Sequence, residues 1–166
     1  MDKSIAKQLE SCKSFSAIFR LVKRCVREVL GQERAGLSLG LSMLPPDVGA
    51  TYSVTSNFII LNKLFLLLLR ELIPDRKIIN SYIFYVLLRE YLHSLGITSE
   101  KAVKKLAVKV CTKKLGRDHP ATQMARKGIQ AIIPDLPKLR RYKGEINPLE
   151  IEIIEDFDKD TVDYIM

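Results

Sequence analysis

Three side chains that could exchange protons or hold a ligand interrupt an otherwise apolar segment. Residues 76–95 are apolar nearly all round, a pattern typical of a helix buried at the centre of a fold. Arg89, Glu90 and His93 break this pattern, and their spacing puts them on one side of the helix. Burying such groups costs several kcal/mol unless they are paired or bind something. This polar stripe is therefore the first candidate for a functional site.

One explanation of the stripe requires no ligand. Arg89 would extend to solvent with Glu90 as its ion-pair partner, and His93 would be a hydrogen-bonded core histidine near the helix end. The surrounding residues favour a second explanation.

The block Arg-Glu-Tyr-Leu-His-Ser-Leu-Gly at 89–96 differs at one position from a form of the H-E-x-x-H helix of zincin metallopeptidases. Over roughly residues 34–125, the chain resembles a family of small archaeal zincin-like proteins. The resemblance implies Glu90 as general base, His93 as one zinc ligand and His119 as a candidate further ligand. A histidine directly before Pro120 is also explained as an exposed helix N-cap. Arg89 occupies the place of the first histidine, and a guanidinium is always cationic and has no lone pair to donate. We therefore expect a disabled metal site and no cofactor.

Three functions remain open from the sequence. The leading hypothesis is a catalytically inactive zincin-like protein that binds a protein or peptide. The first alternative is a metal-dependent hydrolase, a peptidase with an altered zinc site that uses Glu90, His93 and His119. The second alternative is a basic protein associated with nucleic acid.

The second alternative depends on a lysine-rich segment that follows the zincin-like helix. Its candidate polyanion contacts are Lys101, Lys104, Lys105, Lys109 and Lys113. No aromatic residues are interleaved with these lysines to stack on bases. A solvated helix face explains the same pattern.

Composition and charge define the class of protein. The chain has 166 residues, of which 47% are hydrophobic, and three scattered cysteines that predict reduced thiols. No apolar stretch is long enough to span a membrane and no secretory leader is evident, so we expect a cytoplasmic protein without a membrane partner. Residues 145–166 carry a net charge of −7, and residues 1–144 carry +15. Such a tail can fold onto the body, lie across a binding cleft or reach a second subunit; the oligomeric state is left open.

The periodicity predicts one mostly helical α+β domain with a small, largely antiparallel sheet. We expect helices within 1–33, a strand and a hairpin within 34–62, helices within 63–128 that include the zincin-like helix 76–95, a basic linker at 129–144 and an acidic strand and tail at 145–166. Ser14, Asn62 and Asp75 are candidate helix N-caps, and Thr98 or Ser99 begins the lysine-rich helix.

Overall fold

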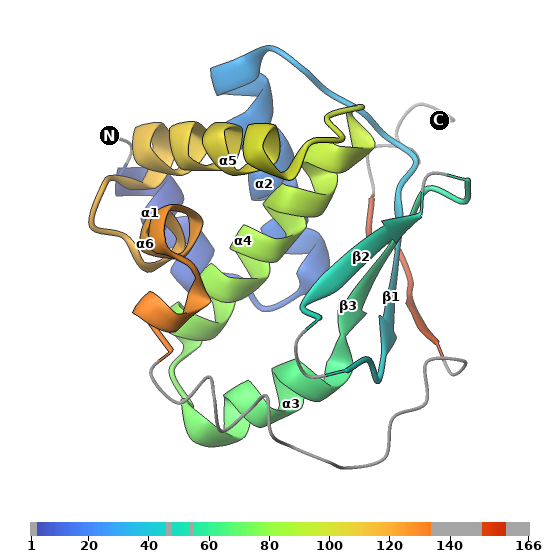
Figure 1. Cartoon of the computed structure of the whole chain (residues 1–166). Coiled ribbons are helices and arrows are strands. Elements are labelled where there is room, and N and C mark those ends of the chain that lie inside the picture. Colours follow the sequence, from blue (N-terminus) through green and yellow to red (C-terminus); the bar gives the residue numbers. More distant parts are fainter. Residues whose placement is uncertain (1–2, 46–47, 54, 134–150, 159–166) are drawn as a thin grey trace.

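The computed structural model describes residues 3–45, 48–53, 55–133 and 151–158. Within these ranges the chain forms six α-helices, one short 3₁₀ helix and four strands, which confirms the α+β class (Figure 1). The helices are α1 (Lys3–Ser11), α2 (Phe15–Leu30), α3 (Lys63–Leu72), α4 (Arg76–Ser94), α5 (Glu100–Leu115) and α6 (Pro120–Lys127). The strands are β1 (Ser38–Ser42), β2 (Ala50–Ser53), β3 (Phe58–Asn62) and β4 (Glu152–Ile154).

The sheet has the strand order β2-β3-β1-β4. The β2–β3 hairpin and the β1–β4 pair are antiparallel, as expected for a largely antiparallel sheet. The central pair β1–β3 is parallel, so the sheet is mixed. This pairing places β3 between β1 and β2. The connection from β1 to β2 therefore passes over the carboxyl-terminal end of β3.

Helix α4 occupies the centre of the helical layer, which packs on one side of the sheet (Figure 1). It contacts α1, α2, α3, α5 and α6, and it also contacts β2. The largest fully buried side chains include Tyr82, Phe84 and Tyr91 of this helix. An all-round apolar surface therefore fits its position, because partners surround it.

Local capping residues begin the helices where the sequence predicts. Ser14, Asn62, Asp75 and Ser99 each precede a helix and accept a hydrogen bond from a main-chain N–H of its first turn. Gly31 ends α2 with φ 69°, a left-handed conformation that glycine adopts without steric cost.

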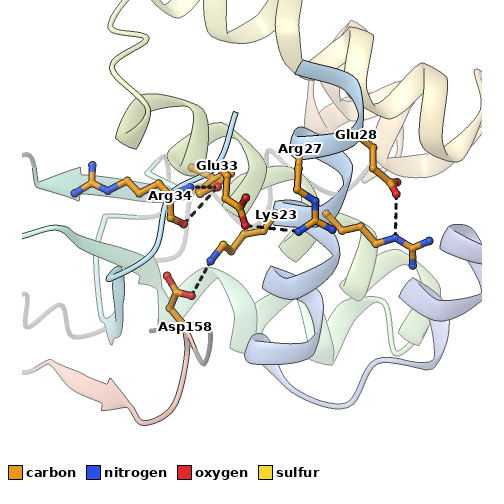
Figure 2. Close-up of polar contacts among 8 residues, drawn as sticks. Lys23, Arg27, Glu28, Glu33, Arg34 and Asp158 are labelled. Carbon is orange, nitrogen blue, oxygen red and sulfur yellow. Dashed lines mark hydrogen bonds and ion pairs between the residues drawn. The ribbon is translucent and has the colours of Figure 1, made fainter. Parts of the chain in front are cut away.

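The described part of the acidic tail is fixed to the basic body. Strand β4 pairs with the free side of β1, and the following Phe157 stacks on Phe19 of α2 with ring centroids 4.2 Å apart. The Asp158 carboxylate accepts a hydrogen bond from Lys23 Nζ at 2.9 Å (Figure 2). It also accepts one from Leu37 N at 3.2 Å. The alternative in which the tail folds onto the body is confirmed for residues 152–158.

Expectations about the linker, the cysteines and membrane-spanning helices can also be compared with the described residues. A 3₁₀ helix at Ile129–Ala131 lies within the predicted linker, whose residues 134–144 are outside the described ranges. Cys12, Cys25 and Cys111 are all free thiols. Among the described helices, none combines the length and apolar character needed to cross a membrane.

Candidate functional site

Arg89 meets a carboxylate from the next helix rather than the neighbouring Glu90. Its Nη2 forms an ion pair with Oε2 of Glu100, the first residue of α5. The guanidinium also lies 5.9 Å from the ring centroid of Tyr85, one turn earlier on α4. The Arg89 side chain is 30% exposed, so it reaches the rim of the helical layer instead of lying in the core. Arg89 is therefore paired with Glu100 and not with Glu90, the partner that the ligand-free explanation of the stripe requires.

The same carboxylate holds His93. The second oxygen of Glu100, Oε1, lies 3.1 Å from His93 Nε2, and Ile97 O lies 2.9 Å from His93 Nδ1. A carboxylate and a carbonyl oxygen both accept hydrogen bonds, so both ring nitrogens of His93 face acceptor oxygens. Arg89, Glu100 and His93 thus form one charged cluster at the carboxyl end of α4.

Glu90 is the buried member of the stripe, with only 6% of its surface exposed. Burial raises the pKa of its carboxyl, and the charges of His93 and Arg89 offset part of that increase. Its carboxylate makes no direct hydrogen bond or ion pair with the described residues. Glu90 therefore lies beside the cluster without being held by it.

His119 lies at the other end of α4 and serves as a helix cap. Its Nδ1 accepts a hydrogen bond from Ala121 N at 3.1 Å at the start of α6. Burial and the nearby charge of Lys77 lower its pKa to about 4. Since Lys77 is in the first turn of α4 and His93 in the last, roughly 24 Å of helix separates them at 1.5 Å per residue. The structure does not bring His119 and His93 together.

Arg89, Glu90 and His93 do not fit a zinc ion as they stand. Arg89 supplies a fixed positive charge, and a ligating imidazole must offer a neutral nitrogen, whereas both His93 nitrogens face acceptor oxygens. Throughout the described ranges, no three His, Cys, Asp or Glu side chains gather as a metal ligand set.

The lysine-rich face is present as the sequence predicts. Lys101, Lys104, Lys105, Lys109 and Lys113 are all exposed on α5. Lys114 lies apart from them and pairs with Glu28 of α2 at 2.7 Å.

Arg34 connects strand β2 with the carboxyl-terminal end of α4, where the Arg89–Glu100–His93 cluster lies. Its Nη1 donates to Ser94 O at 2.6 Å and to Tyr52 Oη at 3.2 Å. Its main-chain N–H donates to the Tyr91 hydroxyl at 2.9 Å. Strand β2 is thereby fixed against the last turns of α4, and two strands separate it from the tail strand β4.

Comparisons of this chain with protein-family models, curated proteins and solved structures give no match. Every functional inference therefore depends on these residues and their geometry.

Sequence reasoning located Arg89 and His93 but missed Glu100, the residue that joins them. The available signal was an acid directly after the Ser99 N-cap. An acid there favours the positive end of a helix, so its type alone has a local explanation. Its contact with α4 depends on the angle between the two helices.

Proposed function

We propose that this chain is a catalytically inactive zincin-like protein that acts by binding a protein or peptide. The observation that carries the proposal is the Arg89–Glu100–His93 cluster, because Arg89 and His93 are the two residues that align with the metal-binding histidines of the H-E-x-x-H motif. A guanidinium there supplies positive charge in place of a metal ion, and Glu100 neutralises it. The helix can then persist without the hydrolytic centre.

The hydrogen-bonded pair of His93 and Glu100 is spaced so that both side chains could ligate one zinc ion. Two ligands at the usual zinc distance of about 2.1 Å are about 3.4 Å apart in a tetrahedral site. His93 Nε2 and Glu100 Oε1 are 3.1 Å apart, close to that separation. A histidine at position 89 would complete a set of two histidines and one glutamate, a ligand set known from catalytic zinc sites.

The test is the zinc content of three proteins purified without chelator: wild type, Arg89→His and Arg89→His/Glu100→Gln. We expect no stoichiometric zinc in wild type, about one equivalent in Arg89→His, and at least a tenfold weaker affinity in the double variant. The double variant is the matched control, because it keeps both histidines and nearly the same side-chain volume.

Two outcomes would contradict the proposal. Stoichiometric zinc in wild type would favour the hydrolase alternative and make peptidase assays the next step. Failure of Arg89→His to bind zinc while it remains folded would mean that the zincin resemblance is accidental.

The edge of strand β2 is the proposed peptide-binding site. Asn62 N donates to Gly49 O at 2.9 Å, which makes that facing pair a hydrogen-bonded one. Hydrogen-bonded pairs alternate along an antiparallel ladder, so the main-chain groups of Ala50 and Tyr52 point away from β3. No strand in the described residues covers this edge. An extended peptide can add to it as a further strand.

A substitution at Ala50 tests this site. Peptides selected from a random library against wild type are titrated against Ala50→Pro, which removes an outward N–H, and Ala50→Val, which keeps it. We expect Ala50→Pro to weaken binding at least tenfold and Ala50→Val to leave it within about threefold. Equal binding to both variants would place the peptides elsewhere.

A further inference from the structure

A cleft of about 630 Å³ lies at the corner between α3 and α4, away from the Arg89–Glu100–His93 cluster. Its walls come from the α1–α2 connection, the first turns of α2, the end of α3 and the first half of α4. Cavities of roughly 300–1,000 Å³ are typical of small-molecule sites.

The cleft has three cations and no carboxylate among its lining residues: Lys13, Arg70 and Arg76. No ion pair joins any of the three to an acid in the described residues. The lining also has an apolar part that includes Phe15, Ile79 and Ile83. A cationic rim beside an apolar wall complements a molecule with an anionic head and a hydrocarbon body.

Two helix N-termini add to the positive potential. Helix α2 begins at Phe15 and α4 at Arg76, and neither has an acid in its first turn. The positive end of a helix dipole normally favours acids and disfavours cations such as Arg76. Asp75 caps α4 but does not line the cleft. Arg76 therefore opposes the stability of its own helix, which favours a role in binding an anion.

The walls of the cleft are fixed before any ligand arrives. Asn80 of α4 is buried, and its Nδ2 donates to Leu9 O at 2.9 Å and to Cys12 O at 3.0 Å. These bonds hold the α1–α2 connection against α4. A preformed site lowers the entropic cost of binding.

We propose that this cleft binds a small organophosphate with an apolar chain, held at its phosphate by Arg70 and Arg76. Guanidinium groups bind phosphate oxygens in pairs, which makes arginine the better phosphate ligand of the two cation types. Lys13 adds a third charge at the rim, and the hydrocarbon chain lies against Ile79 and Ile83.

The experiment is calorimetric titration at about 0.15 M salt with three probes: n-octyl phosphate below its micellar concentration, inorganic phosphate and octyl glucoside. We expect octyl phosphate to bind wild type with one-to-one stoichiometry and at least tenfold more tightly than either other probe. Inorganic phosphate binding equally well would overturn the role of the apolar wall, and octyl glucoside binding equally well would overturn that of the cations.

Two charge-matched variants locate the site. Arg70→Gln/Arg76→Gln should weaken octyl phosphate binding at least tenfold, whereas Lys104→Gln/Lys105→Gln, exposed on α5, should leave it within twofold. Equal weakening in both would mean general charge attraction and would overturn the proposal. The same phosphate chemistry occurs in free small molecules and in lipid headgroups, and vesicles containing phosphatidic acid distinguish these two sources. Binding to them without binding of octyl phosphate would also overturn the small-ligand site.

Discussion

Among Arg89, Glu90 and His93, Glu90 is the residue whose ionisable group is buried inside the helical layer. Arg89 and His93 lie toward the rim and share the carboxylate of Glu100, a partner close to solvent. Glu90 lies one residue away with no such contact among the described residues, and burial raises the pKa of its carboxyl. A group with this placement destabilises the fold whenever it is ionised.

Replacement of Glu90 by glutamine should therefore stabilise the protein near neutral pH. A carboxyl whose pKa is higher in the folded state binds more protons there than in the unfolded chain, so stability falls as pH rises through the folded-state pKa. We expect Glu90→Gln to raise the free energy of unfolding by roughly 1 kcal/mol at pH 7, with the gain vanishing below about pH 4.5. Urea unfolding across this pH range measures it. A Glu90→Gln protein less stable than wild type at pH 7 would mean that the ionised carboxylate is stabilised by its surroundings.

The sequence alone identifies the polar residues of α4 but not Glu100, their partner on α5. The spacing of Arg89, Glu90 and His93 depends only on helix geometry, so the pattern identified them. Glu100 lies beyond the turn at Gly96, and no periodicity links it to α4. Likewise, the resemblance makes His119 a candidate ligand, but α5 begins beside His93 and ends four residues before His119, so the course of α5 carries His119 to the opposite end of α4.

At the scale of elements, Asn62 connects a strand, a loop and a helix. Its Oδ1 accepts from Phe65 N at the start of α3 and from Leu44 N, and its Nδ2 donates to Pro45 O at 2.8 Å and Val48 O at 2.7 Å. The side chain is buried, so all four bonds are shielded from water. The sequence predicts the cap but not the three bonds to the loop between β1 and β2.

We expect Asn62→Ala to cost roughly 2–3 kcal/mol, more than an ordinary N-cap loss of about 1 kcal/mol. Asp75→Ala is the matched control, because Asp75 caps α4 through a single bond to Lys77 N and is exposed. The free energies of unfolding of both variants provide the measurement. Equal costs would show that the loop bonds of Asn62 contribute nothing beyond the cap.

The lysines of α5 provide a second test at this scale. Without interleaved aromatics, we expect them to form a solvated face whose attraction to nucleic acid is general and salt-dependent. Binding of a single-stranded oligonucleotide should weaken by the same factor in Lys105→Gln/Lys109→Gln and in Lys7→Gln/Lys127→Gln, which removes two exposed charges elsewhere. A selective loss of tenfold or more in the α5 variant would favour the nucleic-acid function.

Element boundaries could be predicted because their signals are local, but strand order could not. Alternation and caps located β1, β2, β3 and α4 to within a few residues. The parallel pairing of β1 with β3 depends on how the hairpin packs under the helices. A neighbouring hairpin strand would ordinarily be expected to pair antiparallel, and nothing in the residues of β1 indicates otherwise.

At the scale of the whole molecule, the acidic tail and the basic body form ion pairs with each other within one chain, as far as the described residues show. The acidic tail meets the basic body through Glu152 and Lys63 at 3.2 Å and through Asp158 and Lys23 at 2.9 Å. The first pair is exposed and contributes little to stability, whereas the second is almost fully buried. Phe157 stacks on Phe19, and the Phe19 ring meets Tyr91 of α4 edge-on with centroids 5.4 Å apart, so one ring lies between the tail and the central helix.

Asp158→Asn should destabilise the protein by about 3 kcal/mol, because it removes a charge from a buried ion pair and leaves Lys23 without that carboxylate. The matched control is Asp156→Asn, two residues earlier. Asp156 is exposed and has φ 54°, a conformation that asparagine also tolerates, so the same charge is lost with an expected effect within about 0.5 kcal/mol. Guanidinium unfolding gives the free energies, and limited proteolysis reports whether the tail detaches first. If both substitutions cost the same, net charge rather than the buried pair holds the tail. If Asp158→Asn alone is destabilising and cleavage begins in the tail while the body stays intact, β4 with Phe157 and Asp158 forms a separately released strap on an independently stable domain.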